Sequence, residues 1–186
     1  ITQAFVRERG LNPVGLAGFQ NRYALAMRRE RAEELGIESV QDLAPLAGIL
    51  SAGGDLEFFG RSEWKRLQSL YNLDFAQELT FDAALMYTAV EAGQVDVISA
   101  YSTDGRVAAY DLVLLEDPRQ ALLSYDAMLL ASSAAAQNPR FAAALAPVLG
   151  AISDEAMREA NKMVDVEGRP VSEAVAYLQA IIDKPN

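Results

Sequence analysis

The sequence has 186 residues, of which 51% are hydrophobic and 23% charged, so the chain can bury a core and is not intrinsically disordered. It contains no apolar run of about 18 residues that could span a membrane. Its net charge of −10, without a basic patch, argues against nucleic-acid binding. The chain has no cysteine and no histidine, which excludes disulfides and removes the commonest general base and metal ligand.

The N-terminal ten residues resemble the end of a helix rather than the start of a protein. Ile1, Ala4 and Phe5 lie on one helical face, and Gly10 follows as a stop signal. There is no initiator methionine and no signal peptide. We therefore expect the chain to be a processed or trimmed form.

Strand and helix signals alternate over the first two thirds of the chain, which predicts an α/β fold. Helix signals include Gly36 as a stop, Ser39 with Asp42 as a capping pair, and Asp82 as an N-cap. We expect an irregular strand over 11–19, strands over 23–27, 48–52, 75–79, 95–100, 112–115 and 127–131, and helices over 28–35, 39–43, 62–70 and 82–93.

The last third of the chain is predicted to be helical. One helix starts at Asn138 with Pro139 in its first turn. A second begins at Ser153 and runs to about Val164, and a third spans 171–182 with apolar residues at i, i+3, i+4 and i+7.

The first candidate site is the end of the strand predicted over 95–100. Tyr101, Ser102, Thr103 and Asp104 follow this strand, and Gly105 lets the backbone turn. Ligands of α/β sheets bind beyond the carboxyl ends of strands, so these side chains are candidates for a binding site. The same residues are also ordinary turn formers, and both interpretations stay open at this point.

A second group of candidates consists of an arginine and three tyrosines. The guanidinium of Arg61 could bind a ligand carboxylate through two parallel hydrogen bonds. The alternative is that Arg61 is an ordinary surface arginine. Tyr23, Tyr101 and Tyr125 each stand beside an apolar run, and tyrosine faces attract cations such as quaternary ammonium groups. The other four tyrosines fit core or connector positions better.

Several segments in order along the chain resemble one family. Together they are similar to the substrate-binding proteins of ABC importers for glycine betaine, choline, carnitine and related quaternary amines that act as osmoprotectants. The similarity runs essentially from end to end. The segments are Gly18–Met27, Glu57–Arg61, Asp96–Gly105, Tyr110–Asp117 and Val164–Gly168.

The resemblance implies a type II periplasmic-binding-protein fold with two lobes. Residues 15–102 would form the complete second lobe, and residues 1–14 with 103–186 would form only the C-terminal part of the first lobe. Family members carry a longer N-terminal part with a Pro-Glu-Tyr-Thr-Gly-Thr-like segment that supplies a further tyrosine, and this sequence lacks that segment.

The resemblance also implies the ligand site. The trimethylammonium group would lie in a cage of Tyr23, Tyr101 and Tyr125, with the backbone carbonyl of Asn21 facing the cation and Arg61 holding a carboxylate. Such a protein is not an enzyme, needs no cofactor or metal, and delivers its ligand to an ABC permease. It would be periplasmic or extracytoplasmic and associated with the membrane through the transporter.

A second hypothesis assigns the chain to a different class of function. Without part of one lobe, the chain would serve as an interaction module, forming a homo-oligomer through its exposed sheet edge and binding ligand weakly or not at all. An enzyme comes third, because histidine, cysteine and metal-binding spacings are absent. The sequence leaves glycine betaine, choline, carnitine, proline betaine and ergothioneine open, and Arg61 favours a ligand with a carboxylate.

Overall fold

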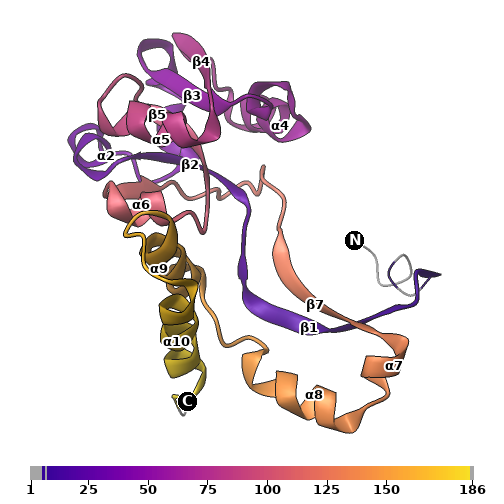
Figure 1. Cartoon of the computed structure of the whole chain (residues 1–186). Coiled ribbons are helices and arrows are strands. Elements are labelled where there is room, and N and C mark those ends of the chain that lie inside the picture. The colour runs from indigo at the N-terminus through magenta and orange to yellow at the C-terminus, as the bar shows by residue number, and fades with distance from the viewer. Residues whose placement is uncertain (1–5, 7, 185–186) are drawn as a thin grey trace. The chain divides into compact units, whose positions relative to one another are not determined.

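The computed structural model of the chain describes residue 6 and residues 8–184, and the chain forms two compact units (Figure 1). We call residues 22–124 the sheet unit. The residues up to Asn21 and those from Tyr125 onward form the ribbon unit. The helix end expected over residues 1–10 lies mostly outside the described residues. No described helix is long and apolar enough to cross a membrane.

The sheet unit, which is described throughout, is built on a five-stranded mixed sheet with the order β4-β3-β5-β2-β6. β3 pairs in parallel with β4 and β5, whereas β2 pairs antiparallel with β5 and β6. Helices connect most of these strands, so the predicted α/β class is confirmed. The strands are β2 (Tyr23–Arg28), β3 (Ser51–Asp55), β4 (Gln77–Phe81), β5 (Val97–Tyr101) and β6 (Leu112–Leu114).

Helix ends in the sheet unit follow the local signals of the sequence. The first helix stops at Gly36, which has a left-handed φ of 65°. The next begins in a capping box, where the Asp42 carboxylate accepts from the backbone N–H and the hydroxyl of Ser39. Asp82 caps a third helix. The helices are α2 (Arg29–Leu35), α3 (Val40–Leu43), α4 (Ser62–Tyr71), α5 (Ala83–Glu91) and α6 (Gly105–Ala109), the last of which was not predicted.

β3 begins later than predicted. The sequence predicted a strand over 48–52 that ends before Gly53 and Gly54, but residues 47–49 form a 3-10 turn and β3 includes both glycines. That prediction was wrong because these glycines do not mark a turn. A Cβ at Gly54 would lie 2.8 Å from the Phe59 ring, which is closer than van der Waals contact allows. The glycines instead permit close packing of aromatic side chains on the strand.

The core of the sheet unit occupies both faces of its sheet, because successive side chains of a strand point to opposite faces. On β2, Tyr23, Leu25 and Met27 belong to one apolar cluster, whereas Ala26 belongs to a second cluster. Tyr101, at the end of β5, packs against the cluster that contains Tyr23. The two tyrosines therefore face the same side of the sheet.

The ribbon unit contains two long strands and the C-terminal helices. β1 and β7 pair antiparallel with irregularities in register, as expected for the glycine- and proline-containing segment over 11–19. The three helices predicted in the last third are present, and Asn138 and Ser153 cap the first two. The elements are β1 (Leu11–Gln20), β7 (Asp126–Ser132), α7 (Ser133–Ala136), α8 (Pro139–Leu145), α9 (Asp154–Asp165) and α10 (Val171–Ile182).

The compact units divide the chain at different points from the expected lobes. The expected division placed 15–102 in one lobe and 103–186 in the other, whereas the units are divided after Asn21 and after Ser124. The difference arises because β6 pairs with β2, so the segment that follows residue 102 completes the sheet. As an assignment of ligand-binding lobes, the expected division stays a prediction.

Candidate ligand-binding site

Two of the predicted site tyrosines lie side by side on neighbouring strands of the sheet. Tyr23 begins β2 and Tyr101 ends β5, and the antiparallel register pairs them directly. Their ring centroids lie 5.0 Å apart with an interplanar angle of 32°, and their hydroxyl oxygens are 3.4 Å apart. Side chains that lie opposite each other on one sheet face are natural contact partners, so the pairing of β2 with β5 builds this aromatic pair.

Arg61 lies beside the same pair. Its Cζ atom is 5.5 Å from the centroid of the Tyr23 ring, and Phe58 packs on Tyr23 with ring centroids 5.1 Å apart. The Arg61 guanidinium also forms ion pairs with Glu57, at 3.1 Å, and with the buried Glu63, at 3.5 Å. The structure thus brings together Tyr23, Tyr101 and Arg61, which are far apart in sequence, and their part in a ligand site stays a prediction. The guanidinium places positive charge next to an aromatic surface.

A buried carboxylate that the sequence analysis did not identify joins the two tyrosines. Asp55, at the end of β3, is only 6% exposed. Its Oδ2 accepts a hydrogen bond from each hydroxyl of Tyr23 and Tyr101, both at 3.0 Å. The sequence offered one signal for it, a carboxylate at a strand end, but the predicted strand stopped at residue 52 and left Asp55 in a loop.

Burial and hydrogen bonding keep both phenols neutral. Desolvation is the main cause that raises the pKa of Tyr23, and hydrogen bonds to Tyr101 and Asp55 raise it further. Desolvation also raises the pKa of Tyr101, while its hydrogen bond with Tyr23 acts in the opposite direction. At neutral pH the pair therefore presents two intact aromatic rings whose hydroxyls act as hydrogen-bond donors.

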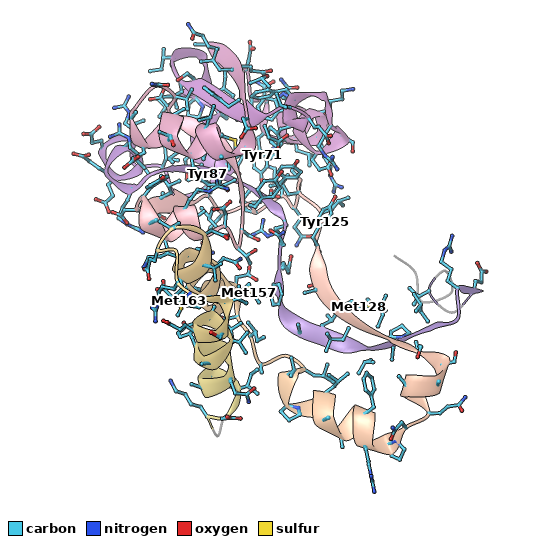
Figure 2. The ribbon with its side chains drawn as sticks, viewed as in Figure 1. Tyr71, Tyr87, Tyr125, Met128, Met157 and Met163 are labelled. Carbon is cyan, nitrogen blue, oxygen red and sulfur yellow. The ribbon has the colours of Figure 1, made fainter. Side chains whose placement is uncertain are left out.

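Asn21 and Tyr125 belong to the ribbon unit. The backbone N–H of Asn21 donates to the carbonyl of Tyr125 at 3.2 Å, so the two backbones are paired. Tyr125 is 43% exposed and immediately precedes β7 (Figure 2). The structure therefore brings these two residues to each other, and their part in a ligand site stays a prediction.

The polar residues after β5 stabilise the local turn. The N–H of Ser102 donates to the carbonyl of Arg22 at 2.9 Å, and the Ser102 hydroxyl accepts from the N–H of Arg22 at 3.1 Å. Asp104 caps α6 and forms an ion pair with Arg106 at 2.6 Å. Thr103 is buried. These contacts support the turn interpretation of Ser102 and Asp104, and Tyr101 is the residue of this stretch that joins the candidate site.

A comparison with protein families decides what kind of protein this is. The family model for the substrate-binding domain of ABC-type glycine betaine transport systems matches residues 1–179. The chain belongs to this family. Proteins of this family are binding proteins of transporters and not enzymes, so the prediction that the chain is not an enzyme is confirmed.

Individual relatives of this binding-domain family agree with that assignment. The carnitine transport binding protein OpuCC of Listeria monocytogenes is 31% identical over 151 residues, which cover 80% of this chain and 49% of that protein. A glycine-betaine-binding protein of Pseudomonas aeruginosa is 34% identical over 162 residues, covering 80% of this chain and 52% of the relative. The chain spans about half the length of these curated relatives.

Solved structures show the same fold. A glycine betaine/carnitine/choline ABC transporter structure matches with a TM-score of 0.88 and 30% identity, covering 97% of this chain and 68% of the other. The apo structure of YehZ from Escherichia coli matches with a TM-score of 0.77 and 25% identity, covering 96% and 68%. The predicted periplasmic-binding-protein type of fold is therefore confirmed.

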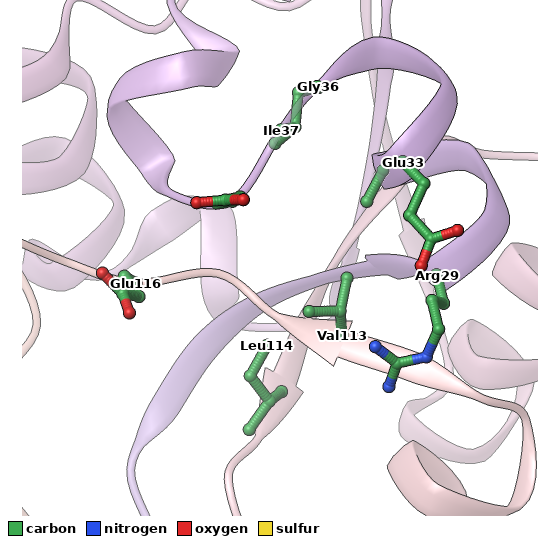
Figure 3. Close-up of a pocket in the computed structure, with 9 residues that line it drawn as sticks. Arg29, Glu33, Gly36, Ile37, Val113, Leu114 and Glu116 are labelled. Atoms are coloured by element: carbon green, nitrogen blue, oxygen red, sulfur yellow. The ribbon is translucent and has the colours of Figure 1, made fainter.

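A separate cavity of about 500 Å³ lies between α2, the turn that follows it, and β6 (Figure 3). Its lining includes Arg29, Glu33, Ile37, Val113 and Glu116. It contains no aromatic residue and shares no residue with the site around Tyr23, so it lacks the surface that a quaternary ammonium group requires. Within the described part of the chain, no group of acidic side chains is arranged to hold a metal ion.

Proposed function

We propose that this chain binds a small quaternary amine as part of the substrate-binding component of an ABC importer for osmoprotectants. The observation that carries the proposal is the pair of Tyr23 and Tyr101 beside Arg61. Two aromatic faces attract a quaternary ammonium group, and a guanidinium binds a carboxylate. Glycine betaine and carnitine contain both groups, in agreement with the names of the relatives.

The ligand would be recognised at its two ends. The trimethylammonium group lies against the rings of Tyr23 and Tyr101, where its contact is partly apolar and partly electrostatic. Arg61 binds the carboxylate and in doing so shares its positive charge with Glu57 and Glu63. We also propose Asn21 and Tyr125 as ligand-binding residues, as the resemblance to the family implies.

The importer also determines the partners and the location that we propose. The chain would act outside the cytoplasm and deliver its ligand to the membrane permease of the transporter, as its membership of this family suggests. Association with the membrane would occur through that permease. The two expected lobes would close on the ligand from two sides. One lobe is residues 15–102, and the other is residues 1–14 with 103–186.

Homo-oligomer formation remains the second proposal. It is favoured by the ribbon unit, in which Leu16 pairs with Met128, and in which Leu16, Met128 and Leu130 are each about two-fifths exposed. Because Met128 and Leu130 are two residues apart on β7, they lie on one face of the ribbon. Exposed apolar side chains on a two-stranded sheet favour association with a second copy of the chain.

The test is a calorimetric titration of the purified chain with glycine betaine and with choline. We expect the wild type to bind both ligands no more than weakly, through the trimethylammonium group that both carry. Arg61→Ala should weaken glycine betaine about tenfold more than choline, because choline has no carboxylate to lose. Arg66→Ala, which removes an exposed arginine from the same helix region, is the matched control and should leave both affinities unchanged.

Two results would count against the proposal. If the wild type binds neither amine even at high ligand concentration, this chain does not by itself have the proposed function, and the interaction-module hypothesis is favoured. If Arg61→Ala weakens both ligands equally, Arg61 supports the structure and does not contact a carboxylate. Circular dichroism of each variant verifies that the fold is retained.

A further inference from the structure

Asp55 has a hydrogen-bonding environment that the proposed function does not use. Oδ2 accepts from the hydroxyls of Tyr23 and Tyr101, each at 3.0 Å. Oδ1 accepts from the backbone N–H groups of Glu57 and Phe58, at 2.9 and 3.0 Å. All four partners are therefore hydrogen-bond donors, two at each oxygen.

This environment is built for an ionised carboxylate. An ionised aspartate only accepts hydrogen bonds, so it satisfies four donors at once. A protonated aspartic acid would instead donate to one tyrosine hydroxyl, and that hydroxyl would have to rotate to accept. The four donors stabilise the negative charge of Asp55, and the Arg61 guanidinium places positive charge beside the same tyrosines.

We propose that Asp55 is a positioning and specificity-determining residue of the tyrosine site, which orients both phenols and favours ligands with a net positive charge. This inference rests on the proposed function and identifies a residue that selects among its ligands. By holding both hydroxyls on one oxygen, Asp55 fixes the rings of Tyr23 and Tyr101 at their separation of 5.0 Å.

Two physical effects make Asp55 favour cations. First, a phenol that donates to a carboxylate has more electron density on its ring, which strengthens the attraction of the ring face for a cation. Second, the buried negative charge attracts a trimethylammonium group and repels the carboxylate of a zwitterion. Asp55 and Arg61 therefore act in opposite directions, because Asp55 favours choline and Arg61 favours glycine betaine.

Asp55→Asn separates these effects from a loss of structure. Asparagine has the same shape, and its carbonyl oxygen continues to accept from the N–H groups of Glu57 and Phe58. Its NH2 group then faces Tyr23 and Tyr101, whose hydroxyls rotate and accept hydrogen bonds instead of donating them. The variant keeps the contacts, removes the charge and reverses the direction of the hydrogen bonds.

The experiment measures the affinities of the purified chain for choline and for glycine betaine by calorimetry. We expect Asp55→Asn to weaken choline about tenfold and glycine betaine less, which is the opposite preference to that of Arg61→Ala. Asp74→Asn, at an exposed position of the same unit, is the matched control and should change neither affinity. Equal losses for both ligands would overturn the role in specificity.

A second measurement does not depend on ligand binding. Ultraviolet absorbance of the phenolate group follows tyrosine ionisation in the wild type and in Asp55→Asn. The substitution should lower the pH at which Tyr23 and Tyr101 ionise, because an NH2 donor stabilises the phenolate that a carboxylate disfavours. Unchanged ionisation would overturn the coupling between Asp55 and the tyrosines.

Tyr101→Phe provides a variant that keeps the ring and removes its hydrogen bond to Asp55. It should weaken both amines if the hydroxyl contact positions the ring, whereas unchanged affinities would contradict the positioning role. If the wild type binds neither amine, the chain does not by itself have the proposed function, and the ionisation experiment still decides whether Asp55 controls the two phenols.

Discussion

Tyr71 illustrates how a single side chain holds the connection that leaves the sheet unit. Its hydroxyl donates to the carboxylate of Asp117 and accepts from the backbone N–H of Arg119 at 2.7 Å. The Arg119 guanidinium lies 5.2 Å from the centre of the Tyr71 ring, and Asp117 also accepts from the N–H of Leu122. Tyr71 thus fastens α4 to the segment that follows β6.

The environment of Tyr71 predicts a dependence of stability on alkaline pH. Burial and the hydrogen bond to Asp117 raise the pKa of Tyr71 to about 12, above the value of about 10 in an unfolded chain. The neutral phenol is favoured in the folded state, so its stabilising contribution is complete below pH 10 and is lost as the pH rises towards 12. Tyr71→Phe should lower the free energy of unfolding by about 1.5–3 kcal/mol below pH 10.

Urea unfolding at a series of pH values measures this difference. The gap between the wild type and Tyr71→Phe should shrink as the pH rises above 10. A gap that stays constant through this range would contradict the prediction. Tyr177→Phe, which removes a tyrosine hydroxyl from α10, controls for a general effect of losing one phenol.

At the scale of single elements, close packing against β3 determines where the aromatic side chains of the candidate site can lie. Its Gly54 lies against Phe58 and Phe59, where an added Cβ would come within 3.2 Å of both rings. The same strand ends in Asp55, which is three residues before Phe58 and six before Arg61. β3 therefore positions both the Asp55 carboxylate and the aromatic side chains that pack beside it.

Gly54→Ala should destabilise the protein by about 1–3 kcal/mol, because the extra methyl group forces the aromatic side chains to move. Gly48→Ala is the matched control, since nothing lies within 4 Å of a Cβ at that position. Its effect on the free energy of unfolding should be within about 0.5 kcal/mol. Similar losses for the two substitutions in urea unfolding would show that crowding at Gly54 is not the cause.

At the scale of the whole molecule, the hydrophobic core is distributed unequally. Both apolar clusters consist of residues within the sheet unit, including Trp64, Leu67 and Tyr87, which are almost completely buried. The buried apolar residues that are described in the ribbon unit are mostly small, such as Ala17, Ala131 and others on α9 and α10. Since burial of large apolar side chains supplies most of the stability of a fold, the sheet unit should be the stable part.

We therefore expect a fragment of residues 22–124 to fold by itself. It should unfold cooperatively in urea and keep the near-ultraviolet signal of Trp64, because its sheet, helices and core are all contained within it. An unfolded fragment would show that the ribbon unit is needed for folding.

Light scattering of the entire chain, with Leu130→Lys as a variant, shows whether the exposed face of the ribbon leads to self-association.

The sequence by itself determined most of the local structure. Gly36, Asp42 and Asp82 set helix ends as predicted, because caps and stops depend on residues only a few positions apart. The apolar runs predicted the strands over 23–27 and 95–100 for a similar reason. Family membership was also evident from ordered sequence segments, and the comparisons confirmed it.

Only the tertiary structure decided how the site is assembled. Tyr23 and Tyr101 are 78 residues apart, and their contact depends on the pairing of β2 with β5. Asp55 lies beneath both hydroxyls because β3 runs next to β5, and β6 joins the sheet because it pairs with β2. Strand order and register result from long-range packing of side chains on two sheet faces, which no short segment of the chain contains.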